Sequence, residues 1–417
     1  MRVLQINQCH FPRGGADIVF LSTIEALKNR GHDVSSFSTI GERNTPTEWD
    51  RYFIEAPDLR SASLGQKLNY ATSYLYNQNA VRSLEQLIDN FQPEVAHVHL
   101  FHATLSVSVL EALYKKNVPV VHTVHDYRLL CPVNTMMDSN KNVCERCVKG
   151  SPLNCVIKRC SDGSLAQSSM VAMEAIYWRK FKSPFKYIDH FHFVSDFCRS
   201  KHIDAIPELE DVSSVHYNFP GIERRSAILK EEKYYLYFGR ISSEKGILTL
   251  LKAWAKLSPE FRLKVVGTGS MMGEVKDFVS RHSISNVEFL GYKSGDKLTE
   301  IIAKAFFVIV PSEWYENNPM TIVESYHLGV PVLGADIGGI PEIIVNGKTG
   351  FIFQPKNYED LYRVIVETSK ISETQYLQFS ERCMAFADDH FSEISNYEYL
   401  MHVYKKVISD KQNILVK

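Results

Sequence analysis

Two cations in the second half of the chain have the types and spacing that binding of a diphosphate requires. Arg240 ends the apolar run YYLYFGR, and Lys245 follows within the same short loop. A guanidinium and an ammonium placed close together can neutralise an anion that gains charge as a bond to it breaks. The alternative is an exposed loop that carries ordinary surface charges.

Two glutamates further along could bind hydroxyl groups. Glu316 and Glu324 are separated by seven residues in EWYENNPMTIVESYHLGVPV, and Pro319 lies between them. Proline is favoured in the first turn of a helix, so we predict a helix that begins here. The first carboxylate would precede the helix and face a sugar, and the second would accept two adjacent ribose hydroxyls. The alternative is a solvated helix face.

Two glycine turns could let an anion approach the backbone. In VVGTGSMMG, Gly267, Gly269 and Gly273 follow a predicted strand at a spacing one residue off the dinucleotide-binding fingerprint, so a nicotinamide cofactor is only weakly indicated. A tight strand-to-helix turn is the alternative. Gly14 and Gly15 lie between the first predicted strand and its helix, where helix amides bind anions or where the chain merely reverses.

One histidine stands at a position that could reach a ligand. His125 and Asp126 end the predicted strand VPVVHTVHD, and the carboxyl end of such a strand is where an α/β sheet presents side chains to a ligand. A lone histidine is more often structural. His125 is kept as a candidate ligand-contacting residue, and Asp126 is given less weight.

Five of the eight cysteines fall between Cys131 and Cys160. Cys144 and Cys147 form a C-x2-C pair and Cys155 and Cys160 a C-x4-C pair, spacings that are typical of tetrahedral thiolate sites. We predict that these four cysteines hold one structural zinc and that Cys131 is left in the core. Reduced buried thiols and disulfides are the alternatives.

A basic and aromatic segment, AIYWRKFKSPFKY, begins at Ala175 and contains no acidic residue. A surface of this composition can lie on anionic lipid headgroups. A solvated helix end is the more common case for such a segment, and a peripheral contact with the membrane is the alternative that we carry forward.

Composition limits the class of protein. The chain has 417 residues, and 47 Lys and Arg oppose 48 Asp and Glu, so the formal charge of −1 does not favour a nucleic-acid partner. Apolar residues make up 45% of the chain, as in globular proteins. No stretch approaches the roughly 18 uncharged apolar residues of a membrane span, and the first residues lack the apolar core of a signal peptide. We expect a cytoplasmic enzyme.

Short β-branched runs alternate with helical periods along the whole chain, which predicts the α/β class with parallel sheets covered by helices. The expected strands form two series, and each series predicts one doubly wound sheet. The first series is RVLQIN, HDVSSF, VAHVHL, VPVVHTVHD and HFHFVS, and the second is YYLYFGR, RLKVVGTG, NVEFLGY, FFVIVPS and PVLGAD. Between them lies NFPGIERRS, where we expect an interdomain connection with a hinge near Gly221.

The segments named above, together with VPSEWYENNPMTIVESYHLGVPVLGADIGGIPEII and NGKTGFIF, resemble in order and spacing the retaining GT-B glycosyltransferases of family 4, the glycosyl transferases group 1. HTVHDYRLLCP and PRGGAD in the first half are similar to further segments of that family. The resemblance covers nearly the whole chain. It implies two Rossmann-like domains that face each other across a cleft: an acceptor-side domain over 1–220, a nucleotide-sugar domain over 221–391, and a last helix over about 392–417 that packs back on the first domain.

The resemblance also implies a role for each candidate residue. Arg240 and Lys245 would bind the donor diphosphate, Glu324 the nucleotide ribose, and Glu316 the transferred sugar near its 3-hydroxyl. His125 would touch the donor sugar. The other expected contacts are the backbone amides of Asn317, Asn318 and Met320 at sugar hydroxyls, Gly291 and Tyr292 near the base, and Gly14, Gly15 and Gly267 near the phosphates.

From this resemblance we expect a metal-independent, retaining transfer of a sugar from a nucleotide-diphosphate donor to a glycan or lipid-linked acceptor in surface polysaccharide biosynthesis. UDP- and GDP-sugars are preferred over ADP-sugars as donors. Glu316 is assigned to sugar binding and stabilisation, with same-face attack through an ion pair. The alternatives are a nucleotide-sugar epimerase or hydrolase of the same fold, and a non-catalytic sugar-nucleotide-binding partner of a glycan assembly complex.

Overall fold

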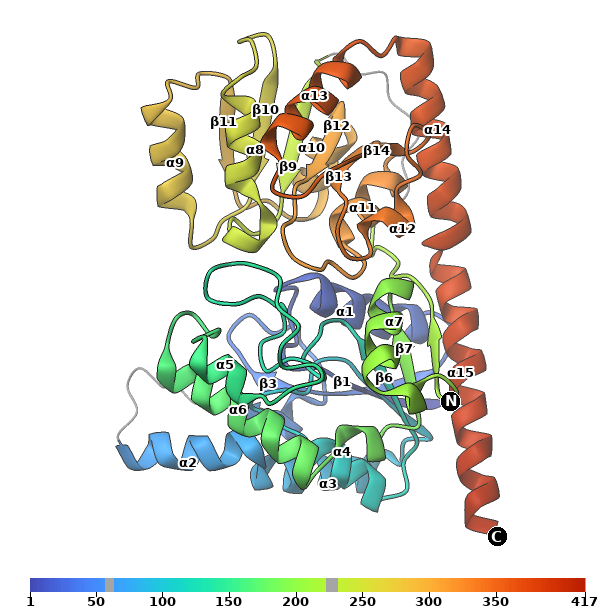
Figure 1. Cartoon of the computed structure of the whole chain (residues 1–417). Coiled ribbons are helices and arrows are strands. Elements are labelled where there is room, and N and C mark those ends of the chain that lie inside the picture. The colour runs from blue at the N-terminus through green and yellow to red at the C-terminus, as the bar shows by residue number, and fades with distance from the viewer. Residues whose placement is uncertain (57–63, 223–231, 417) are drawn as a thin grey trace. The chain divides into compact units, whose positions relative to one another are not determined.

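The computed structural model of the chain describes residues 1–56, 64–222 and 232–416 (Figure 1). It divides into two compact units, each built on one parallel sheet. The first unit comprises Met1–Ser139, Cys144–Tyr217 and Glu393–Lys417, and the second comprises Asn140–Val143 and Asn218–Ser392. The expected connection NFPGIERRS thus begins at the division, and its residues 223–226 lie outside the described part of the chain.

The sheet of the first unit has six parallel strands in the order β2-β1-β5-β6-β7-β8. All five strands expected from the sequence are present in it. The strands are β1 (Arg2–Ile6), β2 (Asp33–Phe37), β5 (Val95–Val98), β6 (Val120–Val124), β7 (His190–Phe193) and β8 (Ser213–Val215). The sequence did not predict β8 or the small two-stranded sheet of β3 (Thr39–Ile40) and β4 (Ile54–Glu55).

Helices connect and cover these strands. The first one, expected over 16–30, is α1 (Gly15–Lys28), with Gly14 as its N-cap. The others are α2 (Leu64–Leu75), α3 (Gln78–Phe91), α4 (Ser108–Lys115), α5 (Leu153–Ile157), α6 (Leu165–Lys180) and α7 (Asp196–Ala205), with short 3-10 turns η1 (Asp50–Tyr52), η2 (Pro184–Lys186) and η3 (Pro207–Leu209). Asn77 and Ser195 cap α3 and α7 through side-chain oxygens, which satisfies amides that a helix start leaves open.

The last helix, α15 (Glu393–Val416), packs on the sheet of the first unit. Leu400, Val403, Tyr404 and Val407 share one buried cluster with residues of β1, β2, β5 and β6. These positions recur every three or four residues, which is the period of one helix face. The end of the chain is therefore part of the core around the first strand.

The sheet of the second unit also has six parallel strands, in the order β11-β10-β9-β12-β13-β14. The five strands that the sequence predicted in this half are all present, and β14 is additional. The strands are β9 (Tyr234–Phe238), β10 (Arg262–Val266), β11 (Val287–Gly291), β12 (Phe307–Val310), β13 (Val332–Ala335) and β14 (Gly350–Phe353). The two parallel, helix-covered sheets establish the α/β class that the sequence predicted.

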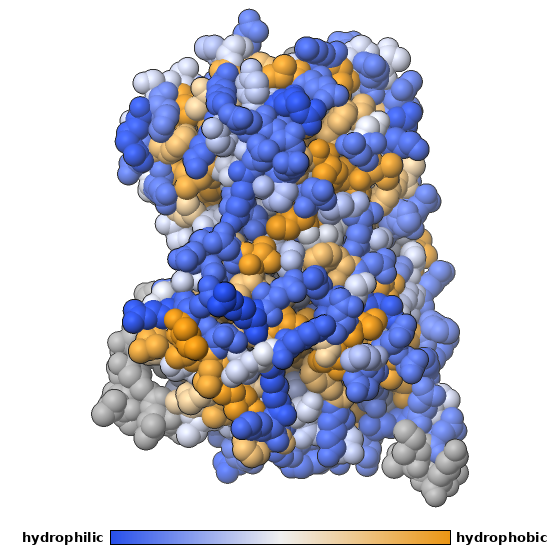
Figure 2. Space-filling model, in the orientation of Figure 1, coloured by the Kyte–Doolittle hydropathy of each residue, from blue (hydrophilic) through white to orange (hydrophobic). Residues whose placement is uncertain are grey.

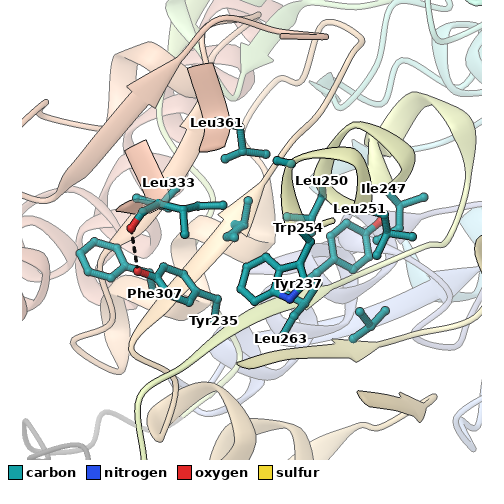
Figure 3. Packing of buried hydrophobic residues seen from close by; sticks show 14 of the residues in the cluster. Tyr235, Tyr237, Ile247, Leu250, Leu251, Trp254, Leu263, Phe307, Leu333 and Leu361 are labelled. Carbon is teal, nitrogen blue, oxygen red and sulfur yellow. Dashed lines mark hydrogen bonds between the residues drawn. The ribbon is translucent and has the colours of Figure 1, made fainter. Parts of the chain in front are cut away.

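Buried aromatic and branched side chains fill one face of this sheet. Figure 3 shows Tyr235 and Phe307 from the strands and the fully buried Trp254 from α8 within one cluster. The helices of this unit are α8 (Ile247–Trp254), α9 (Met272–Arg281), α10 (Gly295–Ala303), α11 (Met320–His327), α12 (Ile340–Ile343), α13 (Tyr358–Ser369) and α14 (Glu373–His390), with the 3-10 turn η4 (Ser243–Lys245). Such a packed face holds the strand ends, and hence the loops that follow them, in fixed positions.

None of the helices in the described residues combines the length and the apolar character that crossing a membrane requires.

Candidate functional site

The loops that follow β9 and β12 lie where the strand order of the second sheet reverses. β9 and β12 are neighbours, while β10 and β11 extend from the other side of β9. In open α/β sheets, ligands bind at the carboxyl ends of strands at such a point. The Glu313 amide donates a hydrogen bond to the Glu244 carbonyl, 2.8 Å away, and so joins the two loops. Arg240, Lys245 and Glu316 all lie on them.

Lys245 and Glu316 form a hydrogen-bonded ion pair. The Lys245 Nζ lies 2.6 Å from Glu316 Oε1, and the Ser312 hydroxyl donates to the same oxygen at 2.6 Å. Glu316 is only 5% exposed. Burial alone would raise the pKa of Glu316, but the charge and hydrogen bond of Lys245 and the Ser312 hydroxyl outweigh it and hold the pKa below its usual value. The carboxylate is therefore ionised at neutral pH.

The guanidinium group of Arg240 is exposed to solvent. Its side chain is 63% exposed, and its one ion pair in the described structure is a 3.5 Å contact with Glu244. Ser242 donates a hydrogen bond to that glutamate, 2.6 Å long, so Glu244 is already held within the loop. A guanidinium in this setting can turn to an anion at little cost, because exposed ion pairs contribute little stability.

Glu324, on α11, is an acceptor without a recorded donor. Within the described part of the chain it has neither a hydrogen-bond partner nor a counter-ion, although it is half-buried. Desolvation raises the pKa of Glu324 to about 7. A desolvated carboxylate without a hydrogen-bond donor in the protein is suited to accept hydrogen bonds from a ligand, for example from two adjacent hydroxyls.

Glu324→Gln should raise the thermal midpoint of unfolding near pH 8 and change it little near pH 5. Because the pKa of Glu324 is about 7 in the folded protein, above the ordinary value of a glutamate in the unfolded chain, the wild type loses stability as the pH rises through this range. The neutral amide has no such loss. Thermal melts of both proteins at several pH values test this.

Glu274→Gln is the matched control, since Glu274 is an exposed glutamate on α9. Its difference from wild type should be the same at both pH values. A Glu324→Gln difference that is equally independent of pH would contradict the buried, unpartnered state of Glu324.

The loop before α11 is buried and tied to the start of this unit. Asn317 and Asn318 are 7% and 6% exposed. The Asn218 amide donates to Asn318 Oδ1 at 2.9 Å, and the Asn218 side chain donates to the Asn318 carbonyl at 3.3 Å. Pro319 is the N-cap residue and Met320 the first helical residue, as the proline predicted. The first amides of α11 have no partner inside the helix and can donate to a ligand.

Gly338 packs against the backbone of Glu316, and sequence analysis did not identify it as a site residue. Its φ of +64° favours glycine, and a Cβ there would collide with the backbone of Tyr315 and Glu316. The neighbouring Gly339 amide donates to the Glu316 carbonyl at 2.7 Å. The signal that could have revealed this is the GG pair in DIGGIPE, directly after β13.

The VVGTG turn positions the Arg240 loop. Gly267 has a φ of +136°, and a Cβ on it would overlap the carbonyl of Gly239; the Cβ of Gly269 would overlap that of Ile241. The Ile241 amide donates to the Thr268 carbonyl at 2.9 Å. The glycines are needed for this close packing of two loops, which accounts for their spacing without a nicotinamide cofactor.

Gly291 and Tyr292 end β11 at the side of the same turn. The Gly267 amide donates to the Gly291 carbonyl at 2.9 Å. Tyr292 is 64% exposed, so its ring is open to a planar group such as a base. These residues therefore lie next to the VVGTG turn; their expected place near the base stays a prediction.

In the first unit, His125 lies against a second histidine. Its Nε2 is 2.9 Å from Nδ1 of His99, and the other nitrogen of His99 is 3.2 Å from Gln5 Oε1. Because the Gln5 oxygen accepts, His99 carries its proton on Nε2, and His125 Nε2 is the donor to His99. Burial, followed by the charges of His122 and His192, lowers the pKa of His125 to about 3. The ring is neutral at physiological pH.

Further polar side chains continue from His99 through the sheet. Gln5 Nε2 donates to Tyr404 OH at 3.4 Å, and His97 contacts both Tyr404 and Thr123 at 2.6 Å. Sequence analysis did not identify His97 and His99 as candidate site residues, because it interpreted the segment VAHVHL only as a buried strand. Their signal is that polar residues at alternate positions of a buried strand must find partners.

Gly14 and Gly15 lie at the start of α1, as expected. Gly14 is exposed, and a Cβ on it would meet only a carboxylate oxygen of Asp17 at an ordinary 3.8 Å. Asn7 fixes that carboxylate through a 2.8 Å hydrogen bond. The backbone amides at the start of α1 are thus accessible. The fold itself does not require glycine at position 14, because a Cβ would fit there.

The cysteines of the insertion lie close together as free thiols. Cys147 and Cys155 are buried in a small cluster with Tyr74 and Val171, and a hydrogen bond links Cys155 to Cys160. Over residues 1–56, 64–222 and 232–416, no group of three or more His, Cys, Asp or Glu side chains is placed to hold a metal ion. The structure gives no support to the zinc predicted on Cys144, Cys147, Cys155 and Cys160, which stays a prediction.

The basic aromatic segment is largely committed to internal contacts. Trp178 is 4% exposed, Arg179 donates to three backbone carbonyls, and Lys182 pairs with Glu111 at 2.7 Å. Lys180 and Phe181 are exposed, Phe181 by 71%. The continuous basic aromatic surface expected from the sequence is therefore reduced to a few side chains.

Comparison with known proteins assigns both halves of the chain. Residues 13–219 match the family model described as Glycosyltransferase Family 4, and residues 219–381 match that described as Glycosyl transferases group 1. An uncharacterized glycosyltransferase of Methanocaldococcus jannaschii is 31% identical over 175 residues, which are 41% of this chain and 48% of that protein. The match thus spans about half of the length of this curated relative.

Solved structures resemble the whole chain. Sucrose-phosphate synthase from Thermosynechococcus elongatus superimposes with a TM-score of 0.73 at 17% identity, covering 98% of this chain and 99% of that one. Anabaena HepE in complex with UDP and glucose does so with a TM-score of 0.66 at 16% identity, covering 97% and 99%. At these identities the likeness establishes the fold.

Proposed function

Since the chain belongs to the GT-B glycosyltransferases, we propose that it transfers a sugar from a nucleotide diphosphate to an acceptor, with the donor at the carboxyl edge of the β9–β12 sheet. One observation carries this proposal. Lys245, on the loop after β9 that also carries the exposed Arg240, pairs at 2.6 Å with Glu316 on the loop after β12, at the strand-order reversal. A cationic pair beside a buried carboxylate has the chemistry to hold a diphosphate and a sugar together.

The proposed mechanism is electrostatic. Lys245 uses one of its three N–H donors on Glu316 and has others for a phosphate oxygen. Arg240 supplies a second cation, so the two stabilise the diphosphate as it leaves without a divalent metal. Lys245 and Ser312 both donate to Oε1 of Glu316. We propose that the carboxylate also accepts a hydrogen bond from a hydroxyl group of the transferred sugar. Attack on the same face through an ion pair would retain the anomeric configuration.

The proposed donor is a UDP- or GDP-sugar, with ADP-sugars less favoured. The complex of Anabaena HepE with UDP and glucose supports this class of donor. In our assignment Glu324 accepts the ribose hydroxyls, because this half-buried carboxylate of α11 has no donor among the described residues. Asn317, Asn318 and Met320 supply amides to the sugar, and His125 orients it.

A thermal-shift panel of UDP-, GDP- and ADP-sugars tests the proposal. A ligand that binds the folded protein raises its melting temperature by mass action. We expect one nucleotide class to stabilise the wild type and to lose this effect in Arg240→Ala. No shift with any nucleotide sugar would contradict the proposal. Sugar released from the donor without an acceptor would favour a hydrolase or epimerase, and tight binding without turnover a non-catalytic partner.

For the acceptor we propose a glycan or a lipid-linked glycan of surface polysaccharide synthesis, with the enzyme in the cytoplasm and in peripheral contact with the membrane. Figure 2 shows hydrophobic side chains at the surface in the region of α5 and α6. Ile157, Leu153 and Leu165 there are 78%, 53% and 53% exposed. Exposed cations without a recorded ion pair accompany them: Arg146, Lys149, Arg159 and Lys180. Apolar side chains among cations suit an anionic bilayer surface.

Ile157→Ser should weaken flotation of the protein with anionic liposomes. The substitution removes the most exposed of these apolar side chains, and each buried methylene contributes about 0.8 kcal/mol to membrane binding. Ile394→Ser is the control, because Ile394 is 61% exposed on α15 of the same unit. Equal flotation of wild type and both variants, or flotation independent of anionic lipid, would contradict the membrane contact.

A further inference from the structure

A hydrogen-bond network of buried polar side chains crosses the sheet of the first unit and ends at His125. Its members come from the neighbouring strands β1, β5, β6 and β7 and from α15, and each of them is at most 3% exposed. Polar atoms at this depth are satisfied by one another rather than by bulk water. In order along the network, the members before His125 are His192 (β7), Thr123 (β6), His97 (β5), Tyr404 (α15), Gln5 (β1) and His99 (β5).

The far end of the network determines where its protons lie. Nε2 of His192 is 2.9 Å from the backbone carbonyl oxygen of His216, which can only accept, so His192 donates there. Burial lowers the pKa of His192 to about 3, so its ring is neutral and Nδ1 carries no proton. The Thr123 hydroxyl, 3.1 Å from this Nδ1, is therefore the donor to it.

The same proton order continues to Tyr404. Because the Thr123 hydroxyl donates to His192, its oxygen accepts from Nε2 of His97 at 2.6 Å. Burial lowers the pKa of His97 well below its ordinary value, so this ring is also neutral and its Nδ1 carries no proton. That nitrogen accepts from the Tyr404 hydroxyl at 2.6 Å. The Tyr404 oxygen in turn accepts from Nε2 of Gln5 at 3.4 Å.

This order determines the orientation of the Gln5 amide and, through it, the tautomer of His125. If the amide were reversed, its oxygen would face a Tyr404 oxygen whose proton points to His97, with no hydrogen between the two oxygens. Oε1 of Gln5 therefore accepts from Nε2 of His99 at 3.2 Å. Burial also lowers the pKa of His99, so its Nδ1 accepts from Nε2 of His125 at 2.9 Å. The neutral His125 ring then has no proton on Nδ1.

We propose that Tyr404, on the last helix, is a positioning residue for His125. Its hydroxyl joins the part of the network that is anchored at the His216 carbonyl to the part that reaches His125, and so keeps Nε2 of His125 protonated and Nδ1 unprotonated. An unprotonated Nδ1 accepts hydrogen bonds and disfavours other acceptors. In the proposed function, on which this last step rests, the group that His125 contacts on the sugar is therefore a hydroxyl that donates. The tautomer itself does not rest on that function.

Nitrogen-15 NMR of the protein labelled in its histidine rings tests the tautomer directly, because protonated and unprotonated ring nitrogens differ in chemical shift. The signals of His125 are identified as those that disappear in His125→Asn. At neutral pH we expect a protonated Nε2 and an unprotonated Nδ1. A wild-type His125 with its proton on Nδ1, or with protons on both nitrogens, would overturn the proposal without need of a further variant.

Tyr404→Phe keeps the aromatic ring and removes the hydroxyl that joins the two parts of the network. The Gln5 amide can then reverse, so both tautomers of His125 become populated and its ring signals should move toward their average. Tyr397→Phe is the matched control, because it removes from the same helix a hydroxyl that lies 2.8 Å from Nε2 of His32, outside this network. Unchanged His125 signals in Tyr404→Phe, or equal shifts in both variants, would overturn the role of Tyr404.

Enzyme kinetics supply a readout that a merely structural role would not change. Since the proposed contact of His125 is to the sugar, Tyr404→Phe should lower turnover by about tenfold, which corresponds to one hydrogen bond, and leave the affinity for the nucleoside diphosphate unchanged. Tyr397→Phe should change neither. Full turnover with a mixed tautomer, or weaker binding of the nucleoside diphosphate, would overturn the positioning role. The NMR measurement needs no substrate, so failure of the proposed function is distinguished from failure of this inference.

Discussion

Lys245→Ala is expected to reduce turnover by about 100-fold or more. The variant lacks the ammonium group that, in our proposal, stabilises the negative charge developing on the leaving diphosphate. It should also destabilise the protein, by about 3 kcal/mol, since a buried carboxylate that loses its partner is costly. Glu316 would lose its counter-ion and keep the 2.6 Å hydrogen bond from Ser312. Steady-state rates and thermal melts measure the two effects separately.

Two further variants separate electrostatics from folding. Lys245→Ala combined with Glu316→Gln removes both charges of the pair, so stability should return while turnover stays low. Arg240→Ala removes a largely exposed cation and should lower turnover with little change in melting temperature. Near-wild-type rates in both single variants would refute the electrostatic account.

Gly338→Ala is expected to abolish most activity through the position of Glu316. Its φ of +64° and the adjacent backbone of Glu316 leave no room for a methyl group, so the loop must shift. The strained conformation alone costs about 1–3 kcal/mol. Turnover should fall more steeply than donor affinity, because the nucleotide contacts that we propose for Arg240 and Glu324 come from other elements.

The matched control for this substitution is Gly273→Ala. A Cβ at Gly273 meets nothing within 4 Å, and the residue lies inside α9, where alanine is the better helix former. It should leave activity unchanged and stability equal or slightly higher. Equal activity of Gly338→Ala and wild type would show that the Gly338 contact does not position Glu316.

Local sequence patterns were sufficient for the elements that carry the site. The apolar run before Arg240 predicted β9, and Pro319 predicted the start of α11, because both signals depend only on neighbouring residues. The strand order that places β9 beside β12 could not be read in this way. It is set by packing between segments about 70 residues apart, such as the Lys245–Glu316 pair.

The residues that sequence analysis missed act through distant contacts. Gly338 is important because it touches Glu316, and His99 because it orients His125; neither contact is visible in the local sequence. The short strands β8 and β14 lacked a long apolar run. The spacing of the cysteines fits a thiolate site, and Cys147 and Cys155 lie in a small apolar cluster; spacing alone does not determine whether the four thiols hold a metal.

A crystal structure of the protein soaked with its stabilising nucleotide sugar tests the central claim most directly. We predict difference density for a diphosphate within hydrogen-bonding distance of Lys245 and Arg240, with the ribose hydroxyls on Glu324. Donor density bound elsewhere, with Lys245 and Glu324 making no contact to it, would contradict the account.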